Sequence, residues 1–357
     1  MLQRRLILLG SACLALGQLP ARAALAAQEK PANYARRADV RAWARKAAAE
    51  TGLSEASILK TLQKARFQAS VKRLMQDPAR TATKSPNNWL AHRARLLTPQ
   101  FVSYGRRFCR THQKSFLAAQ KACGVPAAVI AAVIGVESHF ARVMGNFRVL
   151  DVLATLSFDD ERRAAFFQQE LACFLQWCAR DNLNPAAVKG SFAGAVGMCQ
   201  FMPSSILRCG TDGDADGRVR LRTSVPDAAA SVGRYLQSEG WDAALPVALE
   251  CTVNEPAARA LETGGIDPET TLEAARKSGV QVEAPKEMSG QTPVLLVRLA
   301  SPSRTLWRLG TQNFSALLHY NRSYFYAESV RELAWHLKEG FGAPPSAKAQ
   351  RKGSGAA

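Results

Sequence analysis

Histidines and closely spaced cysteine pairs are scarce in this sequence of 357 residues, which excludes several kinds of site. The chain has five histidines and no CxxC pair, so the ligand spacings typical of structural zinc are missing. Seven of its eight cysteines follow residue 26. An odd number leaves at least one thiol without an internal partner, and the sequence does not determine which cysteines pair.

A long apolar run lies at the N-terminus. Arg4 and Arg5 precede an apolar stretch over 6–19, and small residues suited to cleavage follow at 21–23 and 24–26. This order is typical of a secretory signal peptide, and the stretch is short for a membrane span. We therefore expect residues 1–26 to direct export to the periplasm, with no transmembrane segment in the mature protein.

Cys13 offers an alternative, a membrane-anchored lipoprotein. The preceding residues 10–12, Gly-Ser-Ala, fit a lipobox poorly, and cleavage there would leave a short apolar core. A soluble exported protein is therefore the favoured interpretation.

Acidic residues are also few. There are 29 Asp and Glu against 47 Lys and Arg, a formal net charge of +18, and such a charge attracts polyanions. Nucleic acid is one candidate, but the export signal and the lack of a recognisable reading motif argue against it. Outside the cytoplasm, the available polyanion is the cell wall with its peptide carboxylates.

Most of the chain has helical patterning. Candidate helices lie at Val40–Thr51 and Ser54–Ala65, with Ser54 as an N-cap, and Phe314–Lys338 is again helical. Pro293–Leu299 and Thr305–Leu309 alternate like short strands. The pattern predicts a mainly α protein of the α+β class with a small β-containing insert.

The stretch Pro126–Gly145 is the most informative one. Pro126 suits a helix start, and the apolar residues from Val129 to Val136 surround the helix, as in a buried helix. Glu137 is the only acid between Pro126 and His139. Burial disfavours the charged form and raises a carboxyl pKa, which yields an acid able to donate a proton near neutral pH. The alternative is a Glu paired with Arg142.

Four separated motifs give this chain a family resemblance. They are VIGVES at 133–138, GNFRVLDVLATLSFD at 145–159, GSFAGAVGMCQFMPSS at 190–205 and HYNRSYFYAESV at 319–330. In this order the chain resembles the B-type lytic murein transglycosylases, enzymes that cut the glycan strands of bacterial peptidoglycan, over about Tyr104–Leu337.

The resemblance implies a lysozyme-like helical core. We expect an N-terminal helical region at 27–105 and the catalytic core at 106–245. The β-containing insert follows at 246–313, a C-terminal helix at 314–342 completes the core, and 343–357 forms a disordered tail.

The resemblance also assigns roles to single residues. Glu137 corresponds to the catalytic Glu, and no cofactor is expected for catalysis. Three glycines between Gly190 and Gly197 are expected to let the backbone approach a flat ligand. For each tyrosine, core packing is the alternative. The expected substrate-binding residues are Tyr104, Arg162, Arg163, Ser191, Gln200, Tyr235, Tyr320, Asn321 and Tyr326.

Asp212–Arg218 reads DGDADGR, the first half of an EF-hand calcium loop. Asp212, Asp214 and Asp216 take positions 1, 3 and 5, and Arg218 offers its carbonyl at position 7. Position 12 is a Thr. The family uses a longer loop with a late Asp, here Asp227, so a structural calcium is expected; an acidic turn without an ion is the alternative.

The expected reaction cuts the MurNAc–GlcNAc bond without water and leaves a 1,6-anhydro sugar, with Glu137 acting as acid and then as base. Peptidoglycan strands are the expected ligand, and other cell-wall enzymes are the expected protein partners. A lysozyme-type hydrolase is one alternative and would need a second carboxylate, for which Asp151, Asp159 and Asp160 are candidates. A non-catalytic wall-binding module is another, against which the intact Glu137-Ser138 argues.

Overall fold

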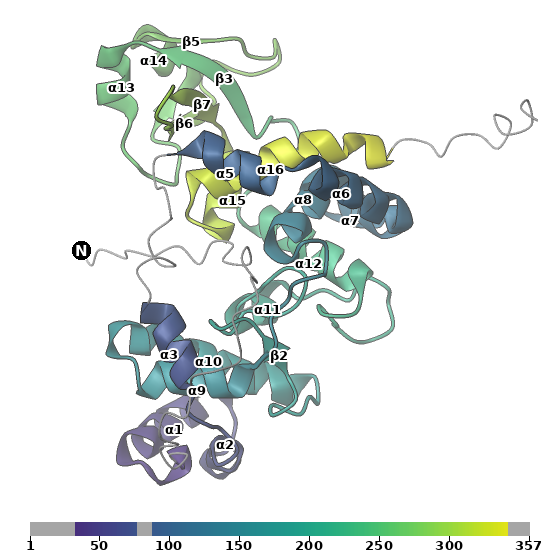
Figure 1. The fold of residues 1–357 in the computed structure, drawn as a ribbon, viewed down its shortest axis with the longest axis vertical. Coiled ribbons are helices and arrows are strands. Elements are labelled where there is room, and N and C mark those ends of the chain that lie inside the picture. Colours follow the sequence, from purple (N-terminus) through teal and green to yellow (C-terminus); the bar gives the residue numbers. More distant parts are fainter. Residues whose placement is uncertain (1–32, 77–87, 342–357) are drawn as a thin grey trace, which may run out of the picture.

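The computed structural model describes residues 33–76 and 88–341. The molecule is elongated, with a helical lobe at one end, a helical layer in the middle and a β-containing insert at the other end (Figure 1). Residues 1–26 with Cys13, most of the predicted loop at 78–88 and the tail at 343–357 lie outside the described residues.

The lobe at one end is built from the early helices and a central segment of the chain. α9 packs along α10, α1 packs against α10, and α3 packs against α9. Ser54 caps α2 as expected, since its side chain accepts from the Ser57 N–H. The elements are η1 (Tyr34–Arg36), α1 (Ala38–Thr51), α2 (Glu55–Leu62), α3 (Ala69–Gln76), β1 (Phe147–Arg148), α9 (Val149–Phe158), η2 (Glu161–Arg163), α10 (Ala164–Arg180) and β2 (Lys189–Gly190).

The middle layer surrounds one buried helix, α8. Every residue of α8 is buried, because α6, α7, α12 and α16 cover it. An apolar sequence all round the helix matches that burial. The elements are α5 (Trp89–Leu96), α6 (Pro99–Thr111), α7 (Gln113–Cys123), α8 (Ala127–Ser138), α11 (Pro203–Cys209), α12 (Val225–Ser238), α15 (Gln312–Tyr320), α16 (Tyr324–Leu337) and η3 (Lys338–Phe341).

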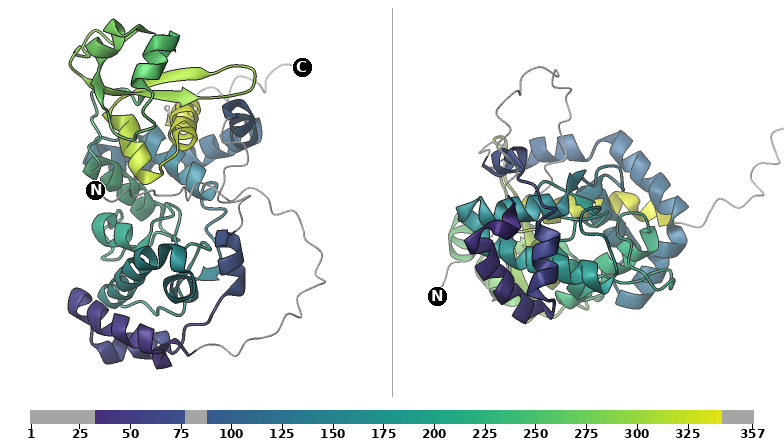
Figure 2. Two further views of the ribbon diagram at one scale, coloured as in Figure 1. Left: turned by 90° about the vertical axis from the view of Figure 1, so that its left-hand side faces the viewer. Right: turned by 90° about the horizontal axis from the view of Figure 1, so that it is seen from below.

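The insert is an antiparallel five-stranded sheet in the order β4-β6-β7-β3-β5, with two short helices. It lies beyond the end of the helical layer, next to α15 and α16 (Figure 2, left). The elements are β3 (Ala248–Val253), α13 (Glu255–Leu261), β4 (Thr270–Thr271), α14 (Leu272–Lys277), β5 (Val280–Val282), β6 (Pro293–Leu299) and β7 (Leu306–Gly310).

Alternation along β6 explains how the insert is attached. Leu295, Val297 and Leu299 join the main core, whereas Val294 and Leu296 belong to a separate small core of the insert. Successive strand residues point to opposite sheet faces, so β6 contributes to both cores at once. The predicted strand at Pro293–Leu299 is confirmed to the residue.

Two expectations about local structure are wrong, and part of the sheet was missed. The helix from Pro126 ends at Ser138 rather than near Gly145. The helix over 314–338 is two helices, because Ser323 caps a new one at Tyr324. Three strands of the insert, β3, β4 and β5, were not predicted, since Ala248–Val253 carries a charge and a cysteine instead of regular alternation.

Among the described residues, no single helix is long and apolar enough to cross a membrane. α7 and α8 reach that length only as a pair, and a bend of 115° separates them.

Candidate active site

Glu137 lies in the last turn of α8, with 8% of its surface exposed. This burial raises the pKa of its carboxyl to about 8, because a low-dielectric surrounding disfavours the charge. No described cation forms an ion pair with Glu137; Arg142, the partner in the alternative interpretation, lies instead over the Tyr104 ring at 3.7 Å. The carboxyl is therefore expected to be protonated at neutral pH.

Tyr326 on α16 faces Glu137. Its hydroxyl is buried and forms no hydrogen bond of good geometry with any described residue. It is nevertheless close enough to Glu137 to lower the pKa of that carboxyl, although burial raises this pKa by more. In turn, burial and the Glu137 charge raise the pKa of Tyr326. No described carboxylate contributes to the pKa of Glu137.

A cluster of aromatic rings continues from Tyr326. Tyr320 lies at 6.1 Å from Tyr326, nearly parallel to it, and at 4.7 Å from Tyr235. The Tyr320 hydroxyl donates to the Cys199 carbonyl at 2.5 Å, and the Tyr235 hydroxyl donates to the His319 carbonyl at 2.9 Å. These bonds join α12, α15 and the loop before α11 near the Glu137 carboxyl.

The chain after Glu137 turns in an uncommon way. His139, Phe140 and Ala141 all have positive φ, between 51° and 69°, a region that costs energy for residues with a side chain. Ser138 supports the turn, because its hydroxyl donates to the Ile134 carbonyl and accepts from the Ala141 N–H.

Phe140 anchors this turn in the core. Its ring lies against Gly135 of α8 and Gly105 of α6, and a Cβ at either glycine would come within 2.5 Å of it. Phe140 is 1% exposed and contacts the ring of Tyr104 at 5.9 Å. Gly105 and Gly135 thus make room for the aromatic ring that fixes the end of α8.

The loop at 190–200 is held by its own polar groups. The Ser191 hydroxyl accepts from the N–H groups of Ala193 and Ala195. Gln200, with φ 48°, donates to the Gly197 carbonyl at 2.8 Å. Both side chains shape the loop whose Cys199 carbonyl binds Tyr320.

The loop glycines have a role within the fold, besides the expected approach of a flat ligand, which stays a prediction. A Cβ at Gly190 would meet the Ala195 carbonyl, and one at Gly197 would meet the Leu221 carbonyl. The close approach is made by the chain itself, and side chains here would break the fold of the loop.

The remaining predicted binding residues lie in two parts of the fold. Asn321 is 7% exposed between α15 and α16. Arg162 and Arg163 lie in the lobe, where Arg162 pairs with Asp160 at 3.3 Å and Arg163 lies over Phe166 at 4.4 Å.

The three candidate second carboxylates are tied to the lobe. Asp151 accepts from the Arg66 N–H and the Gln68 side chain. Asp159 accepts from the Tyr34 hydroxyl and from Arg37, both at 2.6 Å. Asp160 pairs with Arg162. Each of the three carboxylates is therefore bound by groups of the lobe and not by Glu137.

The predicted calcium loop brings three carboxylates together. Asp212, Asp214 and Asp227 each present an oxygen within 4.8 Å of the others, as oxygen ligands of calcium require. Asp227 is fully buried and also accepts from two backbone N–H groups. The Asp216 carboxylate instead pairs with Arg220.

Arg222 is a site residue that the sequence did not reveal. It follows the acidic half of the loop and donates to the Gly145 carbonyl at 3.1 Å and the Asn146 side chain at 3.3 Å. Gln200 also approaches this segment, at 3.5 Å from the Met144 carbonyl. The calcium loop is thereby connected to the turn that follows Glu137.

Comparison with known proteins gives consistent matches. The family model described as a transglycosylase SLT domain matches residues 35–335. The membrane-bound lytic murein transglycosylase B of Escherichia coli (strain K12) is 33% identical over 287 residues, which are 79% of this chain and 78% of the relative.

Two solved structures are similar along nearly the whole chain. The catenated lytic transglycosylase SltB1 from Pseudomonas aeruginosa is 30% identical, with a TM-score of 0.80 over 87% of this chain and 100% of that one. The Escherichia coli lytic transglycosylase Slt35 in complex with calcium is 31% identical, with a TM-score of 0.73 over 87% and 94%.

Proposed function

This chain belongs to the transglycosylase SLT domain family, and on that premise we propose that Glu137 is its single catalytic carboxyl. As a member of the family the chain is an enzyme, a lytic transglycosylase that acts on peptidoglycan. The observation that carries the proposal is the burial of Glu137, which keeps its carboxyl protonated to about pH 8.

The first step is a proton transfer. Glu137 donates its proton to the glycosidic oxygen between N-acetylmuramic acid and N-acetylglucosamine, and the bond from that oxygen to the muramic anomeric carbon breaks. The sugar's own N-acetyl oxygen relieves the positive charge that develops. Such help from the substrate suits this site, because the candidate second carboxylates, Asp151, Asp159 and Asp160, are bound by other groups of the lobe.

The second step reverses the role of Glu137. Its carboxylate accepts the proton of the muramic 6-hydroxyl as that oxygen attacks the anomeric carbon, which closes the 1,6-anhydro ring. The attacking group is tethered to the reacting ring, so the step has the entropic advantage of an intramolecular reaction. The Tyr326 hydroxyl beside Glu137 suits this step, because a donor there stabilises the carboxylate.

Neutral groups and tyrosine rings surround this carboxyl, which supports their role in holding an N-acetylated sugar. Arg162 and Arg163 lie farther along the lobe and would face the peptide stem. The proposed substrate-binding set is Tyr104, Arg162, Arg163, Ser191, Gln200, Tyr235, Tyr320, Asn321 and Tyr326.

We also propose a structural calcium ion. Asp212, Asp214 and Asp227 would hold it with the Arg218 carbonyl, and Asp216 would join them after leaving Arg220. The ion would stiffen the loop that carries Arg222, and it takes no part in the reaction. Similarity to Slt35, solved with calcium, supports the proposal.

For localisation, action on peptidoglycan requires export. We propose that residues 1–26 direct the chain to the periplasm, with a lipid anchor at Cys13 as the alternative. Other cell-wall enzymes are the proposed protein partners.

Replacement of Glu137 by Gln tests the catalytic assignment. The amide keeps the shape and loses the proton, so turnover of purified peptidoglycan should fall by at least about 10²–10⁴-fold. Near-normal turnover by a folded Glu137→Gln protein would reject the assignment.

A measurement of stability against pH checks that the Glu137→Gln variant is folded. The pKa of Glu137 is raised from 4.5 to about 8 on folding, so the wild type loses stability as pH rises through that window, by up to about 1.4 kcal/mol per unit. Gln does not titrate. The variant should therefore be the more stable protein, increasingly so between those pH values.

A further inference from the structure

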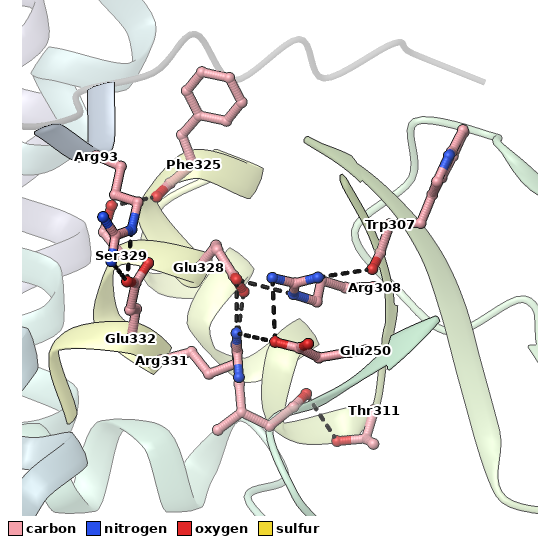
Figure 3. A network of polar contacts seen from close by, with 11 residues as sticks. Arg93, Glu250, Trp307, Arg308, Thr311, Phe325, Glu328, Ser329, Arg331 and Glu332 are labelled. Atoms are coloured by element: carbon pink, nitrogen blue, oxygen red, sulfur yellow. Dashed lines mark hydrogen bonds and ion pairs between the residues drawn. The ribbon is translucent and has the colours of Figure 1, made fainter. Parts of the chain in front are cut away.

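A polar cavity lies between the insert and the helical layer. Its volume is about 460 Å³, and its lining includes Arg304, Arg308, Arg331, Glu250 and Trp335. Figure 3 shows the network at its base, with side chains from β3, β7 and α16 converging. We refer to it as the arginine cavity.

Two of its arginines are held from beneath by a buried carboxylate. Glu328 is fully buried; it binds the Arg308 Nε at 2.9 Å and the Arg331 Nε at 2.7 Å (Figure 3). A guanidinium has five donors in a rigid plane. Glu328 also accepts from the Arg331 Nη2 at 2.8 Å, and the Arg308 Nη1 donates to the Trp307 carbonyl at 3.0 Å, so both guanidinium groups are held in place at the lining of the cavity.

A carboxylate already lies beside both guanidinium groups. The Glu250 Oε1 is 3.4 Å from the Arg308 Nη2 and 3.6 Å from the Arg331 Nη2, and the Glu250 side chain is 74% exposed. These contacts are long for charge-assisted hydrogen bonds. The arginine side chains are only 10% and 23% exposed, but Glu250 is open to water, which weakens both pairs. Another carboxylate can therefore displace Glu250 at low cost.

The rim adds a charge and an aromatic face. Arg304 is exposed, and no described residue pairs with it. Trp335 is 64% exposed, more than any other large hydrophobic side chain in the described part of the chain. An exposed indole beside guanidinium groups suits a ligand with both a flat apolar face and an anionic group.

The cavity is separate from the catalytic carboxyl. Trp335 follows Tyr326 by nine residues on α16, which places the two on opposite sides of the helix, about 180° apart. Tyr326 faces Glu137, so the arginine cavity opens on the other side of α16. A ligand there does not occupy the catalytic groove.

We propose that the arginine cavity binds a carboxylate of a peptidoglycan peptide stem, with Trp335 against the adjoining sugar or peptide. This inference rests on the proposed function, which makes peptidoglycan the polymer that the enzyme contacts. Both the sugars and the peptide carboxylates recur along peptidoglycan. One polymer can therefore contact the catalytic groove and the arginine cavity at the same time. A second contact raises the effective concentration of the polymer at Glu137.

Binding to insoluble peptidoglycan tests the proposal. All variants carry Glu137→Gln to prevent cleavage, and the Kd is measured by co-sedimentation at increasing amounts of wall. Trp335→Ala combined with Arg304→Ala should weaken binding about tenfold, the loss of roughly one charge-assisted contact. Leu117→Ala combined with Arg95→Ala, which remove an exposed apolar side chain and an exposed arginine elsewhere, should leave the Kd unchanged.

Chemical modification of the wall identifies the ligand group. Peptidoglycan whose carboxyls have been converted to amides should bind the parent protein about as weakly as the cavity variant binds the native wall. The cavity variant should bind the amidated wall only slightly more weakly than it binds the native wall. Equal binding by parent and cavity variant, or a loss that persists on the amidated wall, would overturn the proposal.

Cleavage is scored separately. In proteins that retain Glu137, the cavity substitutions should lower turnover of the insoluble wall relative to turnover of a soluble disaccharide-peptide fragment. An equal loss on both substrates would contradict a remote contact. Failure of the wild type to cleave either substrate would reject the proposed function instead.

Discussion

The Tyr326 hydroxyl on α16 lies close to the Glu137 carboxyl on α8, where α16 packs against the fully buried α8. In the proposed mechanism, this pair lets one carboxyl serve twice. Burial stabilises the protonated form needed to cleave the glycosidic bond, and the hydroxyl stabilises the carboxylate needed to accept the next proton.

Activity should depend on pH through Glu137. Because the acid must be protonated in the free enzyme, kcat/KM should fall as pH rises through a pKa near 8. Tyr326→Phe removes the group that lowers this pKa, so the alkaline limb should move upward while the maximal rate falls. The measurement is the pH profile of kcat/KM on a soluble fragment; a limb that moves downward contradicts the assigned contact.

Asp159 should matter for stability and not for the reaction. Its carboxylate binds Tyr34 and Arg37, which hold the start of the chain on the lobe. Asp159→Asn should lower the melting temperature, by an amount typical of losing a charge-assisted bond of about 1.5–3 kcal/mol. The type of product should stay the same; a folded Asp159→Asn protein that no longer cleaves would favour the hydrolase alternative.

Calcium should raise the melting temperature, because an ion that binds only the folded protein stabilises it. Asp214→Ala removes one converging carboxylate that is exposed and outside the helices, so the rise should disappear. Glu287→Ala, which removes an exposed acid in the insert, is the matched control. A chelator without effect on the wild type would show that the loop is an acidic turn.

The sequence predicted the central helix and its acid because both depend on local signals. An apolar segment with one carboxylate indicates a buried helix and a raised pKa, and α8 has both. The end of α8 was not predictable in this way. His139-Phe140-Ala141 contains no glycine or proline, and its left-handed turn is stabilised by the distant packing of Phe140 on Gly105.

The same contrast applies to the surrounding site. The strand at Pro293–Leu299 has a strong pattern of its own, whereas β3 is defined by pairing with β5 and β7 far along the chain. Arg222 carries no local signal either, because its role follows from carbonyl groups some 77 residues away. Residues that act through tertiary contacts were therefore missed, and residues in continuous motifs were found.

The chemistry of the new ends in digested peptidoglycan tests the central claim most directly. Released muropeptides are analysed by mass spectrometry, with and without borohydride reduction, beside a lysozyme digest. Attack by the 6-hydroxyl predicts fragments lighter by one water than those of lysozyme, and ends that resist reduction. Reducible ends as the main product would contradict the account and direct attention to Asp151, Asp159 and Asp160.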